Sequence, residues 1–357
     1  MKLLLISCSQ NAYVLSGKLE ELLKKEMDCE IISGVKCNAL PYVSMEESIK
    51  EFVGKWFYQV DAILFICATG IAVRSIAPYL THKSKDPGVL VMDERGKYCI
   101  SLLSGHMGGG NLLTEKIARM VNAIPVITTA TDIENKFSVD TFAKEWDLTI
   151  ENWNLAKQVS VAVLEEKPIG FISYNAGDEA GISLIKQLEG ALMDKAQGAV
   201  KKDAPGDINL SIDYRMKTGH DNNCLCLIPK VLALGIGCKK NTSLEQVRIA
   251  VRKCFQENNL YEAAISEVAS IDLKKEEPAL IAFCHERKIP FITFSSEELL
   301  EVKGDFASSS FVESVTGVDN VCERSALAAC GECGGRILVK KTVYDGVTIA
   351  VAIGEII

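Results

Sequence analysis

A histidine lies within a glycine-rich turn in the segment 101–111, which reads SLLSGHMGGGN. The pattern predicts a strand, a turn and the start of a helix. Three consecutive glycines cost conformational entropy on folding unless the backbone must approach something closely. We therefore expect His106 to face a ligand, where an imidazole can polarise a carbonyl group or transfer a proton; the alternative is an ordinary exposed loop histidine. The residues of this turn that we expect to bind the ligand are Ser104, Gly105, Gly108, Gly109, Gly110 and Asn111.

Two further turns follow predicted strands and precede predicted helices. In ATGIAVR, 68–74, Gly70 permits an unusual turn, and Arg74 is expected in the first helical turn, where it can bind a carboxylate. In ALGIGCKKNTS, 233–243, two basic residues stand beside a predicted helix start, which favours an anionic ligand. The alternatives are glycines that serve packing and basic side chains that are simply solvated. The residues expected to bind in the second of these turns are Gly235, Gly237, Lys239 and Lys240.

The cysteines and histidines do not predict a metal site. Cys330 and Cys333 have the two-residue spacing of a zinc pair, but a zinc site of that kind needs a second pair. Cys224 and Cys226 alternate along a predicted strand and form no chelating loop. The glycine-rich turns also match neither a phosphate-binding Walker loop nor the nucleophile motif of serine hydrolases.

The spacing of apolar residues predicts an α/β protein with three regions. Over 1–135, short unbroken apolar runs alternate with segments of helical period, which is typical of parallel strands covered on both faces. This region predicts a doubly wound, flavodoxin-like sheet domain. Region 136–229 predicts a small middle α/β region, and region 230–357 a C-terminal α/β domain.

The individual elements follow from the same patterns. A β-hairpin is expected around Asp345 and Gly346 at the end of the C-terminal domain, and an exposed loop over 196–206. The expected strands are 2–7, 29–33, 61–67, 89–93, 97–102, 125–129, 168–173, 231–238 and 290–294. The expected helices are 14–23, 46–57, 71–80, 109–122, 138–147, 153–165, 243–256 and 278–288.

Composition limits the classes of protein that fit. The 357 residues include 39 Lys and Arg against 47 Asp and Glu, a net charge of −8, which argues against a general nucleic-acid binder but allows a locally basic pocket. The longest strongly apolar uncharged run, 62–73, is much shorter than the roughly 20 residues of a membrane-spanning helix. The chain's start is expected to be a strand and not a signal peptide. The 13 scattered cysteines suggest reduced thiols, and we expect a cytoplasmic protein.

Together these segments resemble the cobalt-precorrin-5A hydrolase family of anaerobic cobalamin biosynthesis. The similarity extends over nearly the whole chain; it is strongest over 60–132 and 231–353 and weak in the middle. The SGHMGGGN turn is fairly specific, and the other motifs support it. Cys330 and Cys333 depart from the family pattern. The segments that carry the resemblance are ATGIAVR (68–74), VMDERGKYCISLLSGHMGGGN (91–111), TTATD (128–132), LALGIGCKK (232–240), ASIDLK (269–274) and CERSALAA (322–329).

The resemblance implies an activity that the composition and the spacing do not show. Members of the family open the δ-lactone of a ring-contracting cobalt tetrapyrrole, cobalt-precorrin-5A, and release acetaldehyde to give cobalt-precorrin-5B. The substrate carries its own cobalt, so no cofactor is expected. Its many carboxylates suit Arg74, Lys239 and Lys240. We expect no nucleic-acid or membrane partner; a homodimer and transient contacts with neighbouring enzymes of the pathway stay open.

The resemblance also suggests catalytic roles. His106 is expected to act as a general base or to polarise the lactone oxygen, with backbone N–H groups of the following glycines stabilising the oxyanion. Asp93 or Glu94 is expected to orient the histidine or the attacking water, unless either is only a turn residue. The competing hypothesis is a non-catalytic tetrapyrrole-binding or carrier protein. A nucleotide-binding regulator is disfavoured because no phosphate motif is complete.

Overall fold

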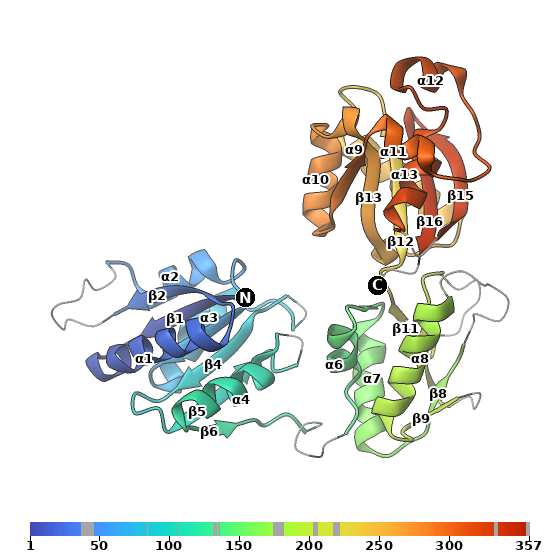
Figure 1. The fold of residues 1–357 in the computed structure, drawn as a ribbon. Coiled ribbons are helices and arrows are strands. Elements are labelled where there is room, and N and C mark those ends of the chain that lie inside the picture. The colour runs from blue at the N-terminus through green and yellow to red at the C-terminus, as the bar shows by residue number, and fades with distance from the viewer. Residues whose placement is uncertain are drawn as a thin grey trace. The chain divides into compact units, whose positions relative to one another are not determined.

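A computed structural model describes residues 1–36, 46–83, 85–106, 108–130, 134, 136–173, 182–202, 206–216, 222–331 and 335–354. The chain divides into two compact units, residues 1–141 and 142–357. The described residues form three sheets, one in the first unit and two in the second (Figure 1). The expectation of an α/β protein is therefore confirmed.

The first unit is built on a six-stranded sheet in the order β2-β1-β3-β4-β5-β6. The first four strands run parallel to one another, β5 runs parallel to β6, and β4 and β5 are antiparallel. The strands are β1 (Lys2–Ser7), β2 (Glu30–Val35), β3 (Ala62–Ile66), β4 (Gly88–Met92), β5 (Tyr98–Leu103) and β6 (Ile124–Val126).

Helices cover both faces of this sheet, as expected for a doubly wound domain. Alternate residues of β1 point to opposite faces: Leu3 and Leu5 pack with α1 and α4, whereas Leu4 and Ile6 pack with α2 and α3. Both faces are therefore buried, which explains the unbroken apolar runs in the sequence. The helices are α1 (Gln10–Glu26), α2 (Ile49–Trp56), α3 (Thr69–Ile76), the 3₁₀ turn η1 (Ala77–Tyr79) and α4 (Gly110–Val121).

The antiparallel pair β4–β5 is the exception in a sheet that is otherwise parallel, as expected. The strands are joined by a short turn in which Asp93 accepts hydrogen bonds from the backbone N–H groups of Arg95 and Tyr98, and Gly96 adopts φ +66°. So short a connection can only return the chain antiparallel, because a parallel crossover needs a dozen or more residues. The end of β5 therefore lies beside the start of β4, where Leu103 pairs with Val89.

The second unit begins with a five-stranded sheet in the order β7-β11-β10-β8-β9. The segment 196–206, expected as an exposed loop, contains β9, which pairs in parallel with β8; Val200 is buried beside Ile169. The strands are β7 (Thr149–Ile150), β8 (Ile169–Phe171), β9 (Val200–Lys202), β10 (Ile208–Ile212) and β11 (Cys224–Ile228). The helices are α6 (Val139–Glu145), which begins in the first unit, α7 (Trp153–Leu164) and α8 (Ile182–Ala196).

The third sheet has the order β14-β13-β12-β16-β15 and ends in the expected hairpin at Asp345 and Gly346. Ser243 caps the helix that follows β12, in a capping box with Gln246. The strands are β12 (Leu232–Cys238), β13 (Ile265–Ile271), β14 (Phe291–Phe294), β15 (Gly335–Tyr344) and β16 (Val347–Gly354). The helices are α9 (Leu244–Glu257), α10 (Pro278–Arg287), α11 (Ser296–Glu301), α12 (Ser310–Thr316), α13 (Val321–Ala329) and the 3₁₀ turns η2 (Glu262–Ala264) and η3 (Asp272–Lys274).

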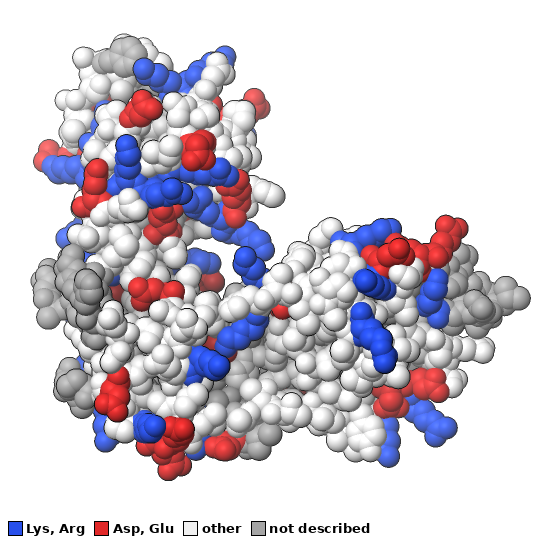
Figure 2. Space-filling view, turned by 180° about the vertical axis from the view of Figure 1, so that it is seen from behind, with Lys and Arg blue, Asp and Glu red and all other residues white. Residues whose placement is uncertain are grey.

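The surface of the chain mixes charges of both signs. Figure 2 shows Lys and Arg side chains beside Asp and Glu side chains on one face of each unit. Among the described residues, no helix has the length and apolarity needed to cross a membrane.

Helix α13 packs so closely on the third sheet that its contact depends on a glycine. A Cβ atom at Gly235, in the middle of β12, would lie 1.9 Å from the backbone oxygen of Cys322 and 2.9 Å from the Cβ of Ala326. The sequence predicted Gly235 as a ligand-binding residue. The structure instead gives it a packing role, because a helix backbone occupies the space that a side chain would need.

We predict that Gly235→Ala destabilises the protein by about 3 kcal/mol, because the added methyl overpacks the contact with α13. Gly237→Ala is the matched control, because it lies on the same strand and its Cβ would meet only side-chain atoms, the Cys322 sulfur at 3.2 Å and the Thr348 Cβ at 3.9 Å. Its expected cost is about 1 kcal/mol or less. Urea unfolding of both variants measures the difference. Equal costs would contradict the packing role of Gly235.

Candidate active site

The glycine-rich turn lies at the edge of the first sheet where β3 and β4 begin. It connects β5 to α4, and β5 runs antiparallel to β4. A Cβ at Gly88, the first residue of β4, would lie 2.8 Å from the backbone oxygen of Gly108. The turn that holds His106 is thus packed directly against the start of β4.

The glycines of this turn are needed because the chain approaches itself. A Cβ at Gly108 would lie 2.5 Å from the Ser104 Cβ and 2.7 Å from the Gly88 nitrogen, and a Cβ at Gly105 would lie 2.3 Å from the Asn111 side-chain oxygen. Gly109 caps α4 in the left-handed conformation, with φ +73°. The close approach that the sequence predicted is therefore real, but in this structure the approaching partner is the protein's own chain.

Two of the three N–H groups expected to stabilise an oxyanion already donate within the turn. The Gly109 N–H donates to the His106 carbonyl oxygen at 2.9 Å, and the Gly110 N–H donates to the Ser104 carbonyl oxygen at 3.2 Å. The Asn111 N–H likewise donates to the Gly105 carbonyl at 2.9 Å. These bonds hold the turn in shape and leave Gly109 and Gly110 poorly suited to bind an oxyanion.

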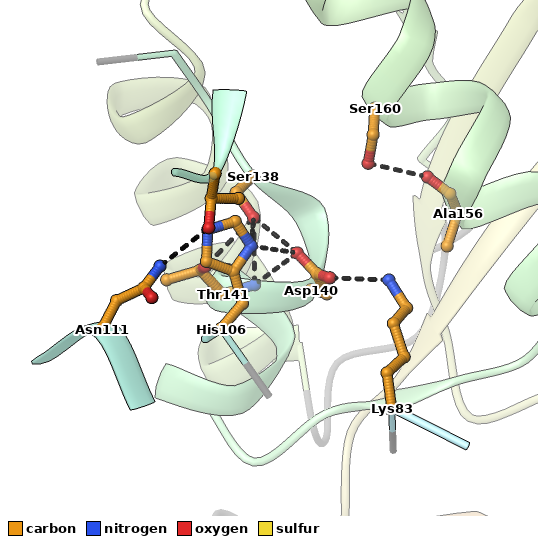
Figure 3. A network of polar contacts seen from close by, with 9 residues as sticks. Lys83, His106, Asn111, Ser138, Asp140, Thr141, Ala156 and Ser160 are labelled. Atoms are coloured by element: carbon orange, nitrogen blue, oxygen red, sulfur yellow. Dashed lines mark hydrogen bonds and ion pairs between the residues drawn. The ribbon is translucent and has the colours of Figure 1, made fainter. Parts of the chain in front are cut away.

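His106 is held by a carboxylate that sequence reasoning missed. Its Nδ1 lies 3.1 Å from the Asp140 Oδ1 and 3.1 Å from the Ser138 Oγ (Figure 3). The His106 and Asp140 side chains are only 11% and 9% exposed. An ionised carboxylate only accepts hydrogen bonds, so the His106–Asp140 bond requires the proton on Nδ1 and leaves the lone pair of a neutral imidazole on Nε2.

Asp140 is in turn held ionised by its neighbours. Burial alone would raise its pKa, but hydrogen bonds from His106, Lys83 and Ser138 and the positive charge of Lys83 outweigh burial and hold the pKa of Asp140 well below its ordinary value. The Lys83 Nζ lies 2.8 Å from the Asp140 Oδ2. The Thr141 N–H also donates to the Asp140 Oδ1 at 3.1 Å. Asp140 stands in the first turn of α6, where the helix dipole also favours a negative charge.

Two polar residues of the turn lie next to His106 along the chain: Ser104 is half-buried and Asn111 is buried. Ser104 adopts φ +52°, a conformation that is rare for a residue with a side chain. Its hydroxyl is buried and has no hydrogen-bond partner within the described part of the chain. The Asn111 Nδ2 donates to the Thr129 Oγ1 at 3.1 Å. Backbone strain and an unsatisfied hydroxyl are features that accumulate at functional sites.

The structure does not bring Asp93 and Glu94 to His106. Both follow β4 at its carboxyl end, whereas His106 lies at the opposite edge of the sheet, beside the start of that strand. Asp93 shapes the β4–β5 turn, and the Glu94 Oε2 accepts a hydrogen bond from the Ser9 hydroxyl at 2.7 Å. The expectation that either carboxylate orients His106 is wrong, because the antiparallel return of β5 separates them.

Gly70 and Arg74 also lie at the carboxyl edge of β3, away from His106. Helix α3 begins at Thr69, so Arg74 stands in its last turn and not in its first. The exposed Arg74 guanidinium donates to the Gly70 carbonyl oxygen at 3.0 Å. Ala68, the N-cap residue of α3, offers no side-chain hydrogen bond to the helix start. The turn and the helix are thus as predicted, but the position of the arginine within the helix is corrected.

Lys239 and Lys240 line a cavity of about 290 Å³ in the second unit, at the start of α9. Gly237 lies in β12, just before them. The cavity therefore places two cations together with polar groups, an arrangement that suits an anionic ligand. Its other lining residues are Asn241, Thr242, Gln246, Asp345 and Gly346.

The described residues contain no group of three or more His, Cys, Asp or Glu side chains that could hold a metal ion. Cys330 is buried, and its thiol donates to the Ala326 carbonyl oxygen at 3.4 Å. Cys333 lies outside the described residues.

We predict that the stability advantage of the protein over its Asp140→Asn variant is lost in acid. An unfolded aspartate has a pKa of about 3.9, and the folded-state pKa of Asp140 is lower, so its ionised form stabilises the fold fully above about pH 5. This contribution falls as the pH drops below about 4, through the folded pKa. Urea midpoints of both proteins at about pH 5 and pH 3 test the prediction. The prediction would be contradicted if the difference between the urea midpoints of the two proteins were the same at both pH values.

Family models for cobalamin biosynthesis match three successive parts of the chain. Residues 51–132 match "Cobalamin synthesis G N-terminal", residues 137–229 match "Cobalamin biosynthesis central region", and residues 232–352 match "Cobalamin synthesis G C-terminus". The resemblance inferred from the sequence motifs is thereby confirmed in each part.

Curated relatives extend the match over most of the chain. The cobalt-precorrin-5A hydrolase of Salmonella typhimurium (strain LT2) is 34% identical over 302 residues, which cover 84% of this chain and 84% of that protein. The cobalt-precorrin-5A hydrolase of Priestia megaterium is 29% identical over 322 residues, which cover 86% of this chain and 82% of that protein. The chain therefore belongs to the cobalamin synthesis G family, as a homologue of the cobalt-precorrin-5A hydrolases.

Proposed function

We propose that this protein is a cobalt-precorrin-5A hydrolase, which opens the δ-lactone of its cobalt-tetrapyrrole substrate and releases acetaldehyde to give cobalt-precorrin-5B. The names of its relatives support the choice of substrate. The observation that carries the proposal for this chain is the bond between His106 and Asp140. A histidine oriented by a buried carboxylate is the arrangement that hydrolases use to activate a nucleophile.

The reaction needs a base for the attacking water. In the proposed step, the Nε2 of His106 takes a proton as water attacks the lactone carbonyl, and Asp140 stabilises the imidazolium that forms. Collapse of the adduct breaks the bond to the ring oxygen, which leaves a carboxylic acid on the ring A acetate and a hydroxyl on the extruded carbon. His106 returns its proton to the departing oxygen.

Release of acetaldehyde needs a second proton transfer. The new hydroxyl loses its proton as its carbon–oxygen bond becomes a carbonyl, and the carbon–carbon bond to the macrocycle breaks with its electron pair going to the macrocycle. His106 is neutral again after the first step, so the same Nε2 is available as the base. One histidine can therefore act as the base in both steps, while the macrocycle of the substrate accepts the electron pair of the broken carbon–carbon bond.

The remaining polar groups have supporting roles in this proposal. Lys83 and Ser138 keep Asp140 ionised and aimed at His106, which makes them positioning residues. Lys239 and Lys240 are proposed to bind substrate carboxylates, because they share a cavity with polar groups. A substrate-binding role of Arg74, which is exposed at the edge opposite His106, stays a prediction. Asp93 and Glu94 are left out of the catalytic set because of their position on the sheet.

We predict that His106→Ala lowers kcat by about 10²–10⁴-fold, because it removes the proton acceptor. Asp140→Asn is expected to lower kcat by about 10²-fold or more with little change in KM, because an amide no longer favours the Nδ1–H tautomer or stabilises the imidazolium. The measurement is acetaldehyde release from the lactone-bearing cobalt intermediate, at saturating and at limiting substrate.

Glu94→Gln serves as the comparison, because Glu94 is a carboxylate on the same sheet at the edge opposite His106. It should retain nearly full turnover. If His106→Ala raises KM and leaves kcat unchanged, the histidine binds substrate without taking part in the chemistry. If the unaltered protein binds the intermediate and releases no acetaldehyde, the carrier hypothesis replaces the hydrolase.

A further inference from the structure

Two cysteines flank the point where the strand order of the first sheet reverses. From β1 the chain passes to β2 on one side and then returns to β3 on the other, so the carboxyl ends of β1 and β3 border the switch point of the sheet. Cys8 directly follows β1, and Cys67 directly follows β3. This edge lies opposite the one that holds His106, and nothing in the proposed hydrolysis uses either thiol.

The strand register places the two cysteines side by side. Ser7 pairs with Ile66 in parallel register, and the Cys8 N–H continues this pairing to the Ile66 carbonyl oxygen at 3.4 Å. Neighbouring strands lie about 4.8 Å apart, which falls within the range of about 4.4–6.8 Å between the Cα atoms of a disulfide. Both side chains pack against the same apolar cluster, so they project to the same face of the sheet.

The two thiols are free, and the Cys67 thiol donates to the Ala68 carbonyl oxygen at 3.4 Å. The interaction between the neighbouring thiols lowers the pKa of Cys8 and, together with burial, raises the pKa of Cys67. Burial raises the pKa of thiols elsewhere in the chain, among them Cys99 and Cys322, each to about 12. Cys8 is also half-buried, whereas Cys67 is 9% exposed. Since the thiolate is the reactive form, Cys8 is the better nucleophile and Cys67 the neighbour placed to react with it.

We propose that Cys8 and Cys67 are a redox pair, which forms a reversible disulfide when the protein meets an oxidised low-molecular-mass disulfide. The Cys8 thiolate attacks one sulfur of the small disulfide, forms a mixed disulfide and releases one small thiolate. Cys67 then gives up its proton, attacks the Cys8 sulfur and displaces the second small thiolate. Two protein thiols are oxidised, one small disulfide is reduced to two thiols, and the protons of Cys8 and Cys67 end on these thiols.

The bond would join β1 to β3 immediately before α3, whose first residues include Gly70. It would therefore change the edge of the sheet where open α/β domains hold ligands. A disulfide of this kind in a reducing compartment is transient and acts as a sensor. The inference stands apart from the proposed hydrolase activity, because its test reads thiols and not turnover.

The test incubates the full-length protein with oxidised glutathione, blocks the remaining thiols with N-ethylmaleimide and maps peptides by mass spectrometry. The expected product is a peptide cross-linked between Cys8 and Cys67, which dithiothreitol reverses. Cys67→Ser should instead accumulate glutathione on Cys8. Cys8→Ser should leave Cys67 reduced, because the buried partner lacks a lowered pKa. Cys67→Ala, with circular dichroism of each variant, separates loss of the thiol from loss of the fold.

The matched control is the Cys224→Ser, Cys226→Ser double variant. These thiols are also buried and close in sequence, but they alternate along one strand, so their Cβ atoms lie about 6.6 Å apart, too far for a disulfide. The double variant should give the same Cys8–Cys67 cross-link as the unaltered protein. A glutathione adduct on Cys8 that persists in the unaltered protein, or a cross-link from Cys8 to another cysteine, would overturn the pairing. Absence of any reaction at Cys8 would overturn its role as the nucleophile.

Discussion

The short turn between β4 and β5 decides which residues of the first unit can act together. Asp93 accepts the two backbone hydrogen bonds that close this turn, and the chain returns antiparallel along its own previous strand. Each segment after this turn therefore lies at the opposite edge of the sheet from the one it would reach if β5 ran parallel to β4. The glycine-rich turn meets the start of β4, and α4 covers the same face of the sheet as α1. The residues that the sequence motifs predict to lie together at one edge of the sheet are therefore divided between its two edges.

The charge balance around Asp140 is the second constraint on the site. A carboxylate that is 9% exposed costs free energy unless other groups compensate its charge. Lys83, Ser138 and His106 supply hydrogen bonds from three separate segments, and the Thr141 N–H adds a fourth from the helix start. Because the carboxylate stays ionised, the histidine keeps one tautomer. The same bonds that stabilise the start of α6 thereby prepare the imidazole to accept a proton.

Much of the fold follows from local patterns, and the exceptions have physical reasons. Unbroken apolar runs indicate β1, β3 and β4 because both faces of that sheet are buried. The direction of β5 is not contained in its own residues; it depends on the length of the connection before it. β9 lies in a polar stretch with one buried side chain, so its periodicity is too weak to predict a strand. In region 136–229 the expected strand 168–173 is confirmed as β8, whereas β7 and β9, with two and three residues, are too short for their pattern to predict them.

Only part of the candidate site could be predicted from the sequence. A high density of glycines correctly predicts that the backbone makes a close contact, but it does not identify the group that the backbone contacts. At Gly108 and at Gly235 the partner is the protein's own chain. Asp140 lies 34 residues after His106, in a segment whose only visible signal is helical period, so no short motif connects the two. The Ser138 and Asp140 side chains at a helix start resemble an ordinary cap, which is one of their functions here. Residues that hold a catalytic group through space therefore become visible only when the fold brings their segments together.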